Sequence, residues 1–272
     1  MSELDTLNQH SYSRSPVMDW LASQSAFVDA GERAAYWRIA DSMRGRPILD
    51  LGVGPGRTIG LLRSLSADYV AIDYVSDMVE RAKRAYPLAD VRLGDARDLS
   101  SFADSSFEMV VFSYSGIDSI DHEGRRSVIA EARRVLRPGG VFWFSTLNLD
   151  GPATRYSPWR PPAPRRPSRP AGWVRYGVER ALSMSTVPRC VANYRHGLRL
   201  RRSGDGWAMA PFFSHQWEMV THYTTLEREF AELSEAGFSP DFEVYEDGRG
   251  ARVQPGEALA ADAFCFNILA RR

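Results

Sequence analysis

Three glycines at alternate positions, Gly52, Gly54 and Gly56, follow a short apolar run and precede a segment with helical patterning. A glycine loop between a strand and a helix presents backbone N–H groups to a ligand, and the missing Cβ atoms allow a close approach. The spacing differs from the G-x-G-x-x-G dinucleotide motif, whose last glycine is replaced by Arg57, and no Gly-Lys-Ser/Thr of a P-loop follows. By itself the loop indicates either a cofactor site or a tight turn.

Two aspartates further along the chain narrow the ligand. Asp73 is expected at the end of the next strand, 21 residues after Gly52, where a carboxylate can accept hydrogen bonds from both ribose hydroxyls. Asp95, in the sequence Gly94-Asp95-Ala96, can accept a hydrogen bond from the amino group of adenine, while the Ala96 N–H can donate one to a ring nitrogen. Each residue alone could form a turn or a helix cap. The ordered set favours an adenosine with both ribose hydroxyls free.

Alternating strand and helix patterns surround these residues. Short apolar runs predict strands at 47–52, 68–73, 90–93, 107–113 and 141–146. Helices are predicted at 58–65, 76–86, 122–136 and 225–236, and the last two strands at 242–245 and 263–270. Because the strands are apolar without alternation, we predict an α/β fold that is Rossmann-like and doubly wound. Its seven-stranded sheet would be mostly parallel with an antiparallel last strand.

The predicted elements divide the chain into four segments. We expect an N-terminal helical cap (1–45), a cofactor-binding α/β core (46–149), a Pro/Arg-rich insertion acting as a lid (150–215), and a C-terminal part of the core (216–272). Residues 1–15 show no periodic pattern. One or two helices, broken near Gly31, are expected between 16 and 43.

Several motifs in this order resemble those of class I S-adenosylmethionine (SAM)-dependent methyltransferases. The segments that carry the resemblance are 48–58, 69–79, 94–96, 107–111 and 134–140. The resemblance covers about residues 45–147 and, more weakly, 217–272. It implies a methyl-transferring enzyme with SAM as its cofactor.

The resemblance also implies roles for individual residues. Asp50 and the glycine loop would hold the methionine part of SAM, Asp73 the ribose, and Tyr74 with Met78 the faces of adenine. The residues expected at the cofactor are Asp50, Gly52, Gly54, Gly56, Arg57, Asp73, Tyr74, Met78, Gly94, Asp95, Ala96, Ser113 and Ser115.

Acidic, hydroxyl and imidazole side chains follow the fourth predicted strand, where a methyl acceptor would lie. Transfer from a sulfonium requires alignment, exclusion of water and, for a hydroxyl acceptor, removal of a proton. Asp118 is the first candidate for orienting or deprotonating the acceptor. Asp121 precedes a predicted helix and suits an N-cap, while His122 is either a base or a first-turn helix residue.

Aromatic residues alternate with two histidines between residues 212 and 224. This pattern indicates either an acceptor pocket or a strand with two different faces. We expect His215 and Tyr223 in the pocket, which completes a predicted catalytic set with Asp118 and His122. A metal site of His215, His222 and Asp118 is a less favoured alternative, and we predict no metal.

The insertion is strongly basic. Residues 151–205 carry twelve arginines against Glu179 and Asp205, a net charge of +10, and seven prolines stand in 151–170. A short amphipathic helix is expected around 173–182. The arginines could clamp an anionic acceptor, contact nucleic acid or an anionic surface, or lie on a solvated loop. We favour the lid, because so many prolines argue against a preformed RNA-binding module.

Composition sets the remaining expectations. A chain of 272 residues with 44% hydrophobic content can bury a full core. No apolar stretch reaches about 18 residues and no signal pattern is seen, so we expect no membrane span and a cytoplasmic location. Cys190 and Cys265 are too few for a disulfide framework.

We predict a methyltransferase acting on oxygen or nitrogen of a small molecule, such as a specialised metabolite or modified peptide, as a monomer or homodimer. The acceptor would be anionic if the arginines bind it. The alternatives are an RNA or protein methyltransferase and a cofactor-binding module without activity; nucleic acid is not the expected partner.

Overall fold

The computed structural model describes residues 2–13, 19, 23, 27, 29–160, 172–254 and 256–272. Most of the helical stretch predicted before residue 29 and the proline-rich segment 161–171 lie outside these described residues.

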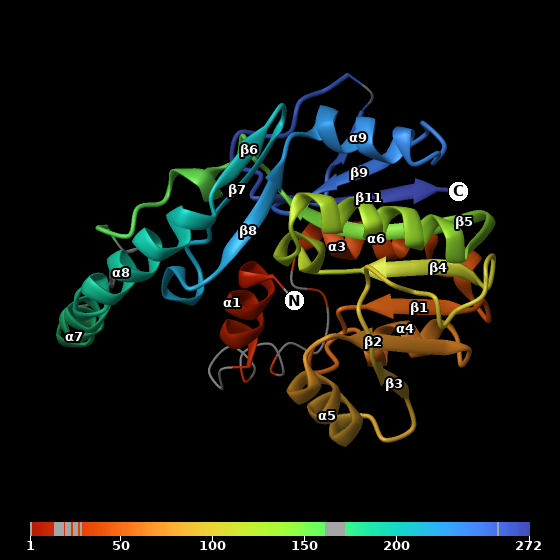
Figure 1. The fold of residues 1–272 in the computed structure, drawn as a ribbon, viewed down its shortest axis with the longest axis horizontal. Coiled ribbons are helices and arrows are strands. Elements are labelled where there is room, and N and C mark those ends of the chain that lie inside the picture. Colours follow the sequence, from red (N-terminus) through yellow and green to blue (C-terminus); the bar gives the residue numbers. More distant parts are fainter. Residues whose placement is uncertain are drawn as a thin grey trace.

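An eight-stranded sheet forms the centre of the molecule, in the order β10-β9-β11-β5-β4-β1-β2-β3 (Figure 1). The strands are β1 Ile48–Leu51, β2 Tyr69–Asp73, β3 Asp90–Leu93, β4 Phe107–Phe112, β5 Leu136–Leu147, β9 Glu243–Glu246, β10 Arg252–Val253 and β11 Cys265–Arg271. Strands β1 to β5 pair in parallel, whereas β11 is antiparallel to both β5 and β9. The predicted mostly parallel sheet with an antiparallel last strand is confirmed. The count of seven strands is wrong by one, because the two-residue β10 is too short to show a sequence pattern.

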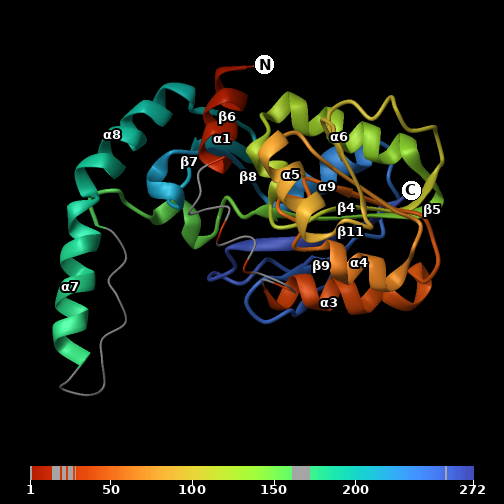
Figure 2. The same cartoon turned by 90° about the horizontal axis from the view of Figure 1, so that it is seen from below.

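Helices cover both faces of this sheet, as predicted. Helices α3 (Ala30–Ile39), α4 (Ile59–Leu65) and α5 (Ser76–Ala85) bury apolar residues in one core cluster. Helices α6 (His122–Val135) and α9 (Leu226–Glu235) contribute to the other. Figure 2 shows α3 and α4 on the face opposite α6. Short 3-10 helices complete the core: η1 Ala40–Met43, η2 Gly116–Ser119 and η3 Pro152–Arg155.

The N-terminal region corrects one expectation and agrees with another. Residues 3–12 form the helix α1 (Glu3–Tyr12), whose N-terminus is closed by a reciprocal capping box between Ser2 and Asp5. The helix boundary predicted near Gly31 coincides with the start of α3 at Ala30, which Asp29 caps. Gly31 itself is helical. It lies in the first turn of α3, where an added Cβ would stand 2.5 Å from the carbonyl oxygen of Glu246, so the glycine permits close packing against the end of β9.

The insertion builds a second, antiparallel sheet of β6 (Arg202–Gly204), β7 (Trp207–Pro211) and β8 (Val220–Thr224). The predicted amphipathic helix is present as α7 (Gly172–Ser185), followed by α8 (Val187–Gly197), η4 (Leu198–Leu200) and, later, η5 (His215–Trp217). In Figure 2 α7 extends away from the main body. Strand β8, which the sequence groups with the core from residue 216 onward, pairs with β7 of the insertion.

Candidate functional site

A cavity that is partly open to solvent lies at the carboxyl ends of β1, β2, β3 and β4. Residues after these four strands line it together with Asp5 and Tyr12 of α1. In an open parallel sheet this edge is where ligands bind. Ten of the thirteen predicted cofactor residues line the cavity: Gly52, Gly54, Arg57, Asp73, Tyr74, Met78, Gly94, Asp95, Ala96 and Ser113.

The glycine loop adopts a backbone that few other residues could adopt. Gly52 has φ +60°, and a Cβ there would stand 2.5 Å from the Phe112 ring. Gly54 has φ +57° with no protein atom within 4 Å of where its Cβ would lie. Because Gly54 lines the cavity, that space is available to a ligand.

Asp73 joins the glycine loop to β2. Its two carboxylate oxygens accept hydrogen bonds from the backbone N–H groups of Gly54 and Val75, both at 2.8 Å. Burial raises the pKa of Asp73 to about 6, although these hydrogen bonds act in the opposite direction. A carboxylate has about four acceptor positions. Asp73 also interacts with the Tyr74 N–H, and it lines the cavity, where its remaining acceptor capacity is available to a hydroxyl donor.

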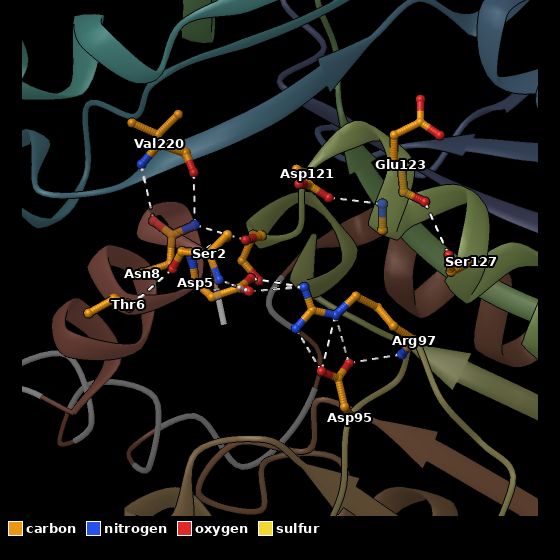
Figure 3. A network of polar contacts seen from close by, with 12 residues as sticks. Ser2, Asp5, Thr6, Asn8, Asp95, Arg97, Asp121, Glu123, Ser127 and Val220 are labelled. Carbon is orange, nitrogen blue, oxygen red and sulfur yellow. Dashed lines mark hydrogen bonds and ion pairs between the residues drawn. The ribbon is translucent and has the colours of Figure 1, made fainter.

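Asp95 marks the other end of the cavity and is held by an arginine (Figure 3). The Arg97 Nη2 atom lies 2.7 Å from Asp95, and Arg97 Nη1 lies 3.0 Å from Asp5 on α1. Ala96, which follows Asp95 in the chain, lines the cavity, and Tyr74 and Met78 line it as well. The chain Asp5–Arg97–Asp95 thus connects α1 to the predicted adenine end.

Further contacts hold α1 over this edge. Asn8 is fully buried and donates to the carbonyl oxygens of Ser119 (2.8 Å) and Val220 (2.9 Å), and it accepts from the Val220 N–H (Figure 3). Tyr12 packs against Val75 and Met78. The sequence analysis missed the contributions of Asp5 and Tyr12, although the Ser2-x-x-Asp5 capping pattern was a signal for a helix here.

Three predicted cofactor residues do not line the cavity. Asp50 is fully buried, and its carboxylate accepts hydrogen bonds from Thr58 Oγ1 (2.6 Å) and Tyr69 OH (2.7 Å). A Cβ at Gly56 would stand 2.9 Å from the Tyr86 ring, and the Ser115 N–H donates to Ser145 Oγ. Asp50 and Ser115 are thus hydrogen-bonded to neighbouring protein groups.

Arg57 lines the cavity from the end of the glycine loop. It forms a bidentate ion pair with Glu32 of α3 (2.7 and 2.9 Å) and donates to Ser113 Oγ (2.8 Å). Both charged side chains are almost fully buried. Arg57 and Ser113 therefore line the wall, while Glu32 lies behind Arg57 and does not line the cavity.

The four predicted catalytic residues also lie outside the cavity lining. Asp118 is fully buried and accepts hydrogen bonds from Arg125 (2.5 Å), Thr146 (2.8 Å) and the Leu147 N–H (2.7 Å). Burial raises its pKa to about 7, against the attraction of Arg125. Its carboxylate is thus held inside the core by protein partners and does not line the cavity.

The predicted histidines and Tyr223 have similar structural contacts. His122 stacks on Trp207, with ring centroids 3.9 Å apart, and its Nδ1 lies 3.2 Å from His222 Nε2. Tyr223 is buried beside Leu147. His215 lies against α1: its Nδ1 is 3.3 Å from Ser11 Oγ, and its ring packs edge-on against Tyr12, which lines the cavity. Burial lowers the pKa of His215 to about 4.

The structure also bears on the predicted N-cap Asp121, the alternative metal site and the membrane prediction. Asp121 caps α6 by accepting from the Gly124 N–H (2.9 Å), as expected. Among the described residues no group of three or more His, Cys, Asp or Glu side chains could hold a metal ion, so Asp118, His215 and His222 do not converge. No helix in the described part of the chain is long and apolar enough to cross a membrane.

Comparisons with known proteins agree with this geometry. A methyltransferase domain family matches residues 48–140. A probable SAM-dependent methyltransferase from Mycolicibacterium smegmatis is 33% identical over 113 residues, which cover 42% of each chain. A demethylmenaquinone methyltransferase from Beutenbergia cavernae is 36% identical over 40% of this chain and 48% of the relative. The chain therefore spans less than half the length of these curated relatives.

The fold itself extends over a larger part of the chain. A SAM-dependent methyltransferase structure from Methanosarcina mazei superposes with a TM-score of 0.55 and 21% identity, covering 86% of this chain and 96% of that one. Residues 48–140 thus match a methyltransferase domain, and the chain shares its fold with a solved SAM-dependent methyltransferase structure.

Proposed function

We propose that the protein transfers a methyl group from SAM to an oxygen or nitrogen atom of a small molecule. The observation that carries this proposal is the position of Asp73, whose buried carboxylate joins the glycine loop to the cavity wall that ends at Asp95. The domain match and the names of the relatives support the cofactor and the reaction class.

The cavity lining fits the parts of SAM in sequence. Asp73 would accept the ribose hydroxyls, Asp95 and the Ala96 N–H would bind the adenine edge, and Tyr74 with Met78 would pack on its faces. The space beside Gly54 and the Arg57–Glu32 pair would receive the methionine part, which bears both an ammonium and a carboxylate group. When bound, SAM supplies an activated methyl group on a sulfonium.

The acceptor would lie beyond the end of β4. Ser113, Tyr114 and Ser119 line this part of the cavity, and Tyr12 of α1 bounds it. Among the described lining residues this end carries hydroxyl groups and no histidine. The chain would therefore act mainly by aligning the acceptor and excluding water. Coverage by α1 supports an acceptor that is small.

Calorimetric titration with SAM and S-adenosylhomocysteine tests the cofactor site. We expect roughly micromolar dissociation constants in the native protein, in the range of ordinary enzyme ligands. Asp73→Ala should weaken binding more than about 100-fold, because two charge-assisted hydrogen bonds contribute roughly 1.5–3 kcal/mol each. Asp68→Ala, an exposed aspartate just before the same strand, is the matched control and should bind normally. Unchanged binding in Asp73→Ala would refute the assignment.

The acceptor class needs a separate experiment. Cell extracts incubated with the protein and methyl-labelled SAM should yield a labelled small molecule by mass spectrometry. Label recovered only in RNA or in protein would replace the proposed acceptor class. No label in any fraction, together with normal cofactor binding, would identify a binding module without activity.

A further inference from the structure

The exposed hydrophobic side chains of this protein are concentrated in the insertion. Twelve large hydrophobic residues are exposed among the described residues, and eight of these lie between 156 and 198. They are Tyr156, Trp159, Trp173, Val174, Val178, Leu182, Met184 and Leu198. Exposed apolar side chains gathered in one region mark an interaction surface.

Helix α7 carries five of these residues and has little protein around it. Val174, Val178 and Leu182 are spaced four apart, so they form one stripe along the helix, and they are 78%, 55% and 62% exposed. Arg175 and Glu179 form an ion pair of 2.7 Å on the neighbouring side. Figure 2 shows α7 extending away from the central sheet. No described element covers the stripe.

The positive charge around this surface indicates which kind of partner it would bind. Residues 151–205 have a net charge of +10, and Arg195, Arg199, Arg201 and Arg202 are exposed near the end of α8 and the start of β6. A second copy of the chain would bring two strongly positive segments together. A nucleic acid would match the arginines but offer nothing apolar to Val174 or Leu182. An anionic bilayer surface matches both features, since its headgroups are negative and the layer beneath them is apolar.

We propose that α7 docks the protein on anionic membrane surfaces, with its axis in the headgroup layer. Val174, Val178 and Leu182 enter the boundary with the acyl chains, and Trp173 lies at the headgroup level. With 14 residues α7 is too short to cross a bilayer, which needs about 20. This inference is independent of the proposed function, because it requires neither SAM nor an acceptor.

Co-sedimentation of the full chain with vesicles tests the proposal. We expect binding to vesicles of equal parts phosphatidylglycerol and phosphatidylcholine, little binding to phosphatidylcholine alone, and a decrease in binding as salt is raised. The triple variant Val174→Asp, Val178→Asp, Leu182→Asp should reduce the partition coefficient at least about tenfold, because it removes apolar insertion and adds negative charge. All three positions are exposed, so the fold should remain.

Two further variants separate the contribution of the arginines from that of the apolar stripe on α7. Arg199→Glu with Arg201→Glu leaves α7 intact and should also weaken binding, with the difference from native protein shrinking at high salt. Leu88→Asp changes an 83% exposed leucine outside the insertion and should bind vesicles like the native protein. Unchanged binding of S-adenosylhomocysteine checks that each variant is folded, and it keeps failure of the docking surface distinct from failure of the cofactor site.

Three results would overturn the proposal. One is absence of binding to both kinds of vesicle. The second is a native dimer in light scattering that the triple variant converts to a monomer, which would assign the stripe to a second copy. The third is tight binding of single-stranded or duplex DNA or RNA that the triple variant leaves unchanged while vesicle binding is weak.

Discussion

Asp73 shows how one buried carboxylate serves both the fold and the ligand. It holds the glycine loop through Gly54 and the start of α5 through Val75, at the point where a ribose would bind. Burial raises its pKa to about 6 in the free protein. Hydroxyl donors bind the ionised carboxylate more strongly, so ligand binding lowers this pKa.

The affinity for S-adenosylhomocysteine should therefore depend on pH. Below pH 6 a proton must leave Asp73 before the ligand binds, so affinity is highest above pH 6 and falls as the pH decreases. We expect the dissociation constant at pH 5 to exceed that at pH 7.5 by about tenfold, since one pKa unit corresponds to 1.36 kcal/mol. Calorimetric titration at several pH values between 5 and 7.5 measures this change in the dissociation constant. Asp73→Asn should flatten the profile; an equal slope in that variant would assign the titration to another buried acid, such as Asp29.

Arg125 carries a second residue-scale prediction. It lies between Asp118 (2.5 Å) and Glu229 (2.7 Å), and all three side chains are fully buried. Arg125→Leu leaves two buried carboxylates without a counter-charge, which should lower the free energy of unfolding by about 3–5 kcal/mol. Urea denaturation measures the loss. Arg126→Leu on the same helix is the control, because Arg126 is half exposed and 3.8 Å from its partner, and it should cost no more than about 1 kcal/mol. Similar losses in both variants would contradict a role for the buried network.

At the scale of elements, α1 is the part of the fold that closes the cavity. Its own length of ten residues is too short for a stable isolated helix. Its stability must come from Asn8, from the Asp5–Arg97 ion pair and from the packing of Tyr12. Opening of α1 should therefore be a local event that leaves the central sheet folded.

Asn8→Ala should release α1 selectively. The change removes three buried hydrogen bonds, each contributing about 0.5–1.5 kcal/mol, and leaves the Val220 N–H and two carbonyl groups without these partners. We expect faster amide hydrogen exchange in residues 3–12, with little change in β1, β4 and β5. Thr6→Ala, on the exposed side of α1, is the control. Faster exchange throughout the central sheet would show instead that α1 unfolds only with the whole domain.

At the scale of the whole molecule, many elements of the fold meet at the cofactor cavity. Four strands, the glycine loop, α1 and η2 all contribute to its wall, so a ligand there should stabilise the entire domain. At a concentration about 100 times the dissociation constant, S-adenosylhomocysteine should add about 2.7 kcal/mol to the free energy of unfolding. This corresponds to a rise in Tm of roughly 5–10 °C, measurable by thermal denaturation. Asp73→Ala should abolish the rise, and an equal rise in that variant would place the ligand elsewhere.

Sequence patterns predicted the core elements well, because they depend on local periodicity. The strands and helices between residues 47 and 136 begin and end close to their predicted limits. The prediction failed at α1, since Asp5, Asn8 and Ser11 are polar but buried and therefore disguise the inward face of the helix. It also failed to show that β8 joins the insertion, because strand pairing is decided by partners distant in sequence.

The sequence by itself determined the cofactor end of the site. Most of the residues predicted there come after a predicted strand, and parallel strands bring their carboxyl ends to one edge, so local patterns placed ten of the thirteen at the cavity. Only the tertiary structure decided which polar residues face the cavity. Asp118 and His122 stand close to that edge in sequence, but Asp118 pairs with Arg125 in the core, and His122 contacts Trp207 and His222, which lies 100 residues further along the chain. A side chain's direction depends on such distant partners, whereas its place at a strand end does not.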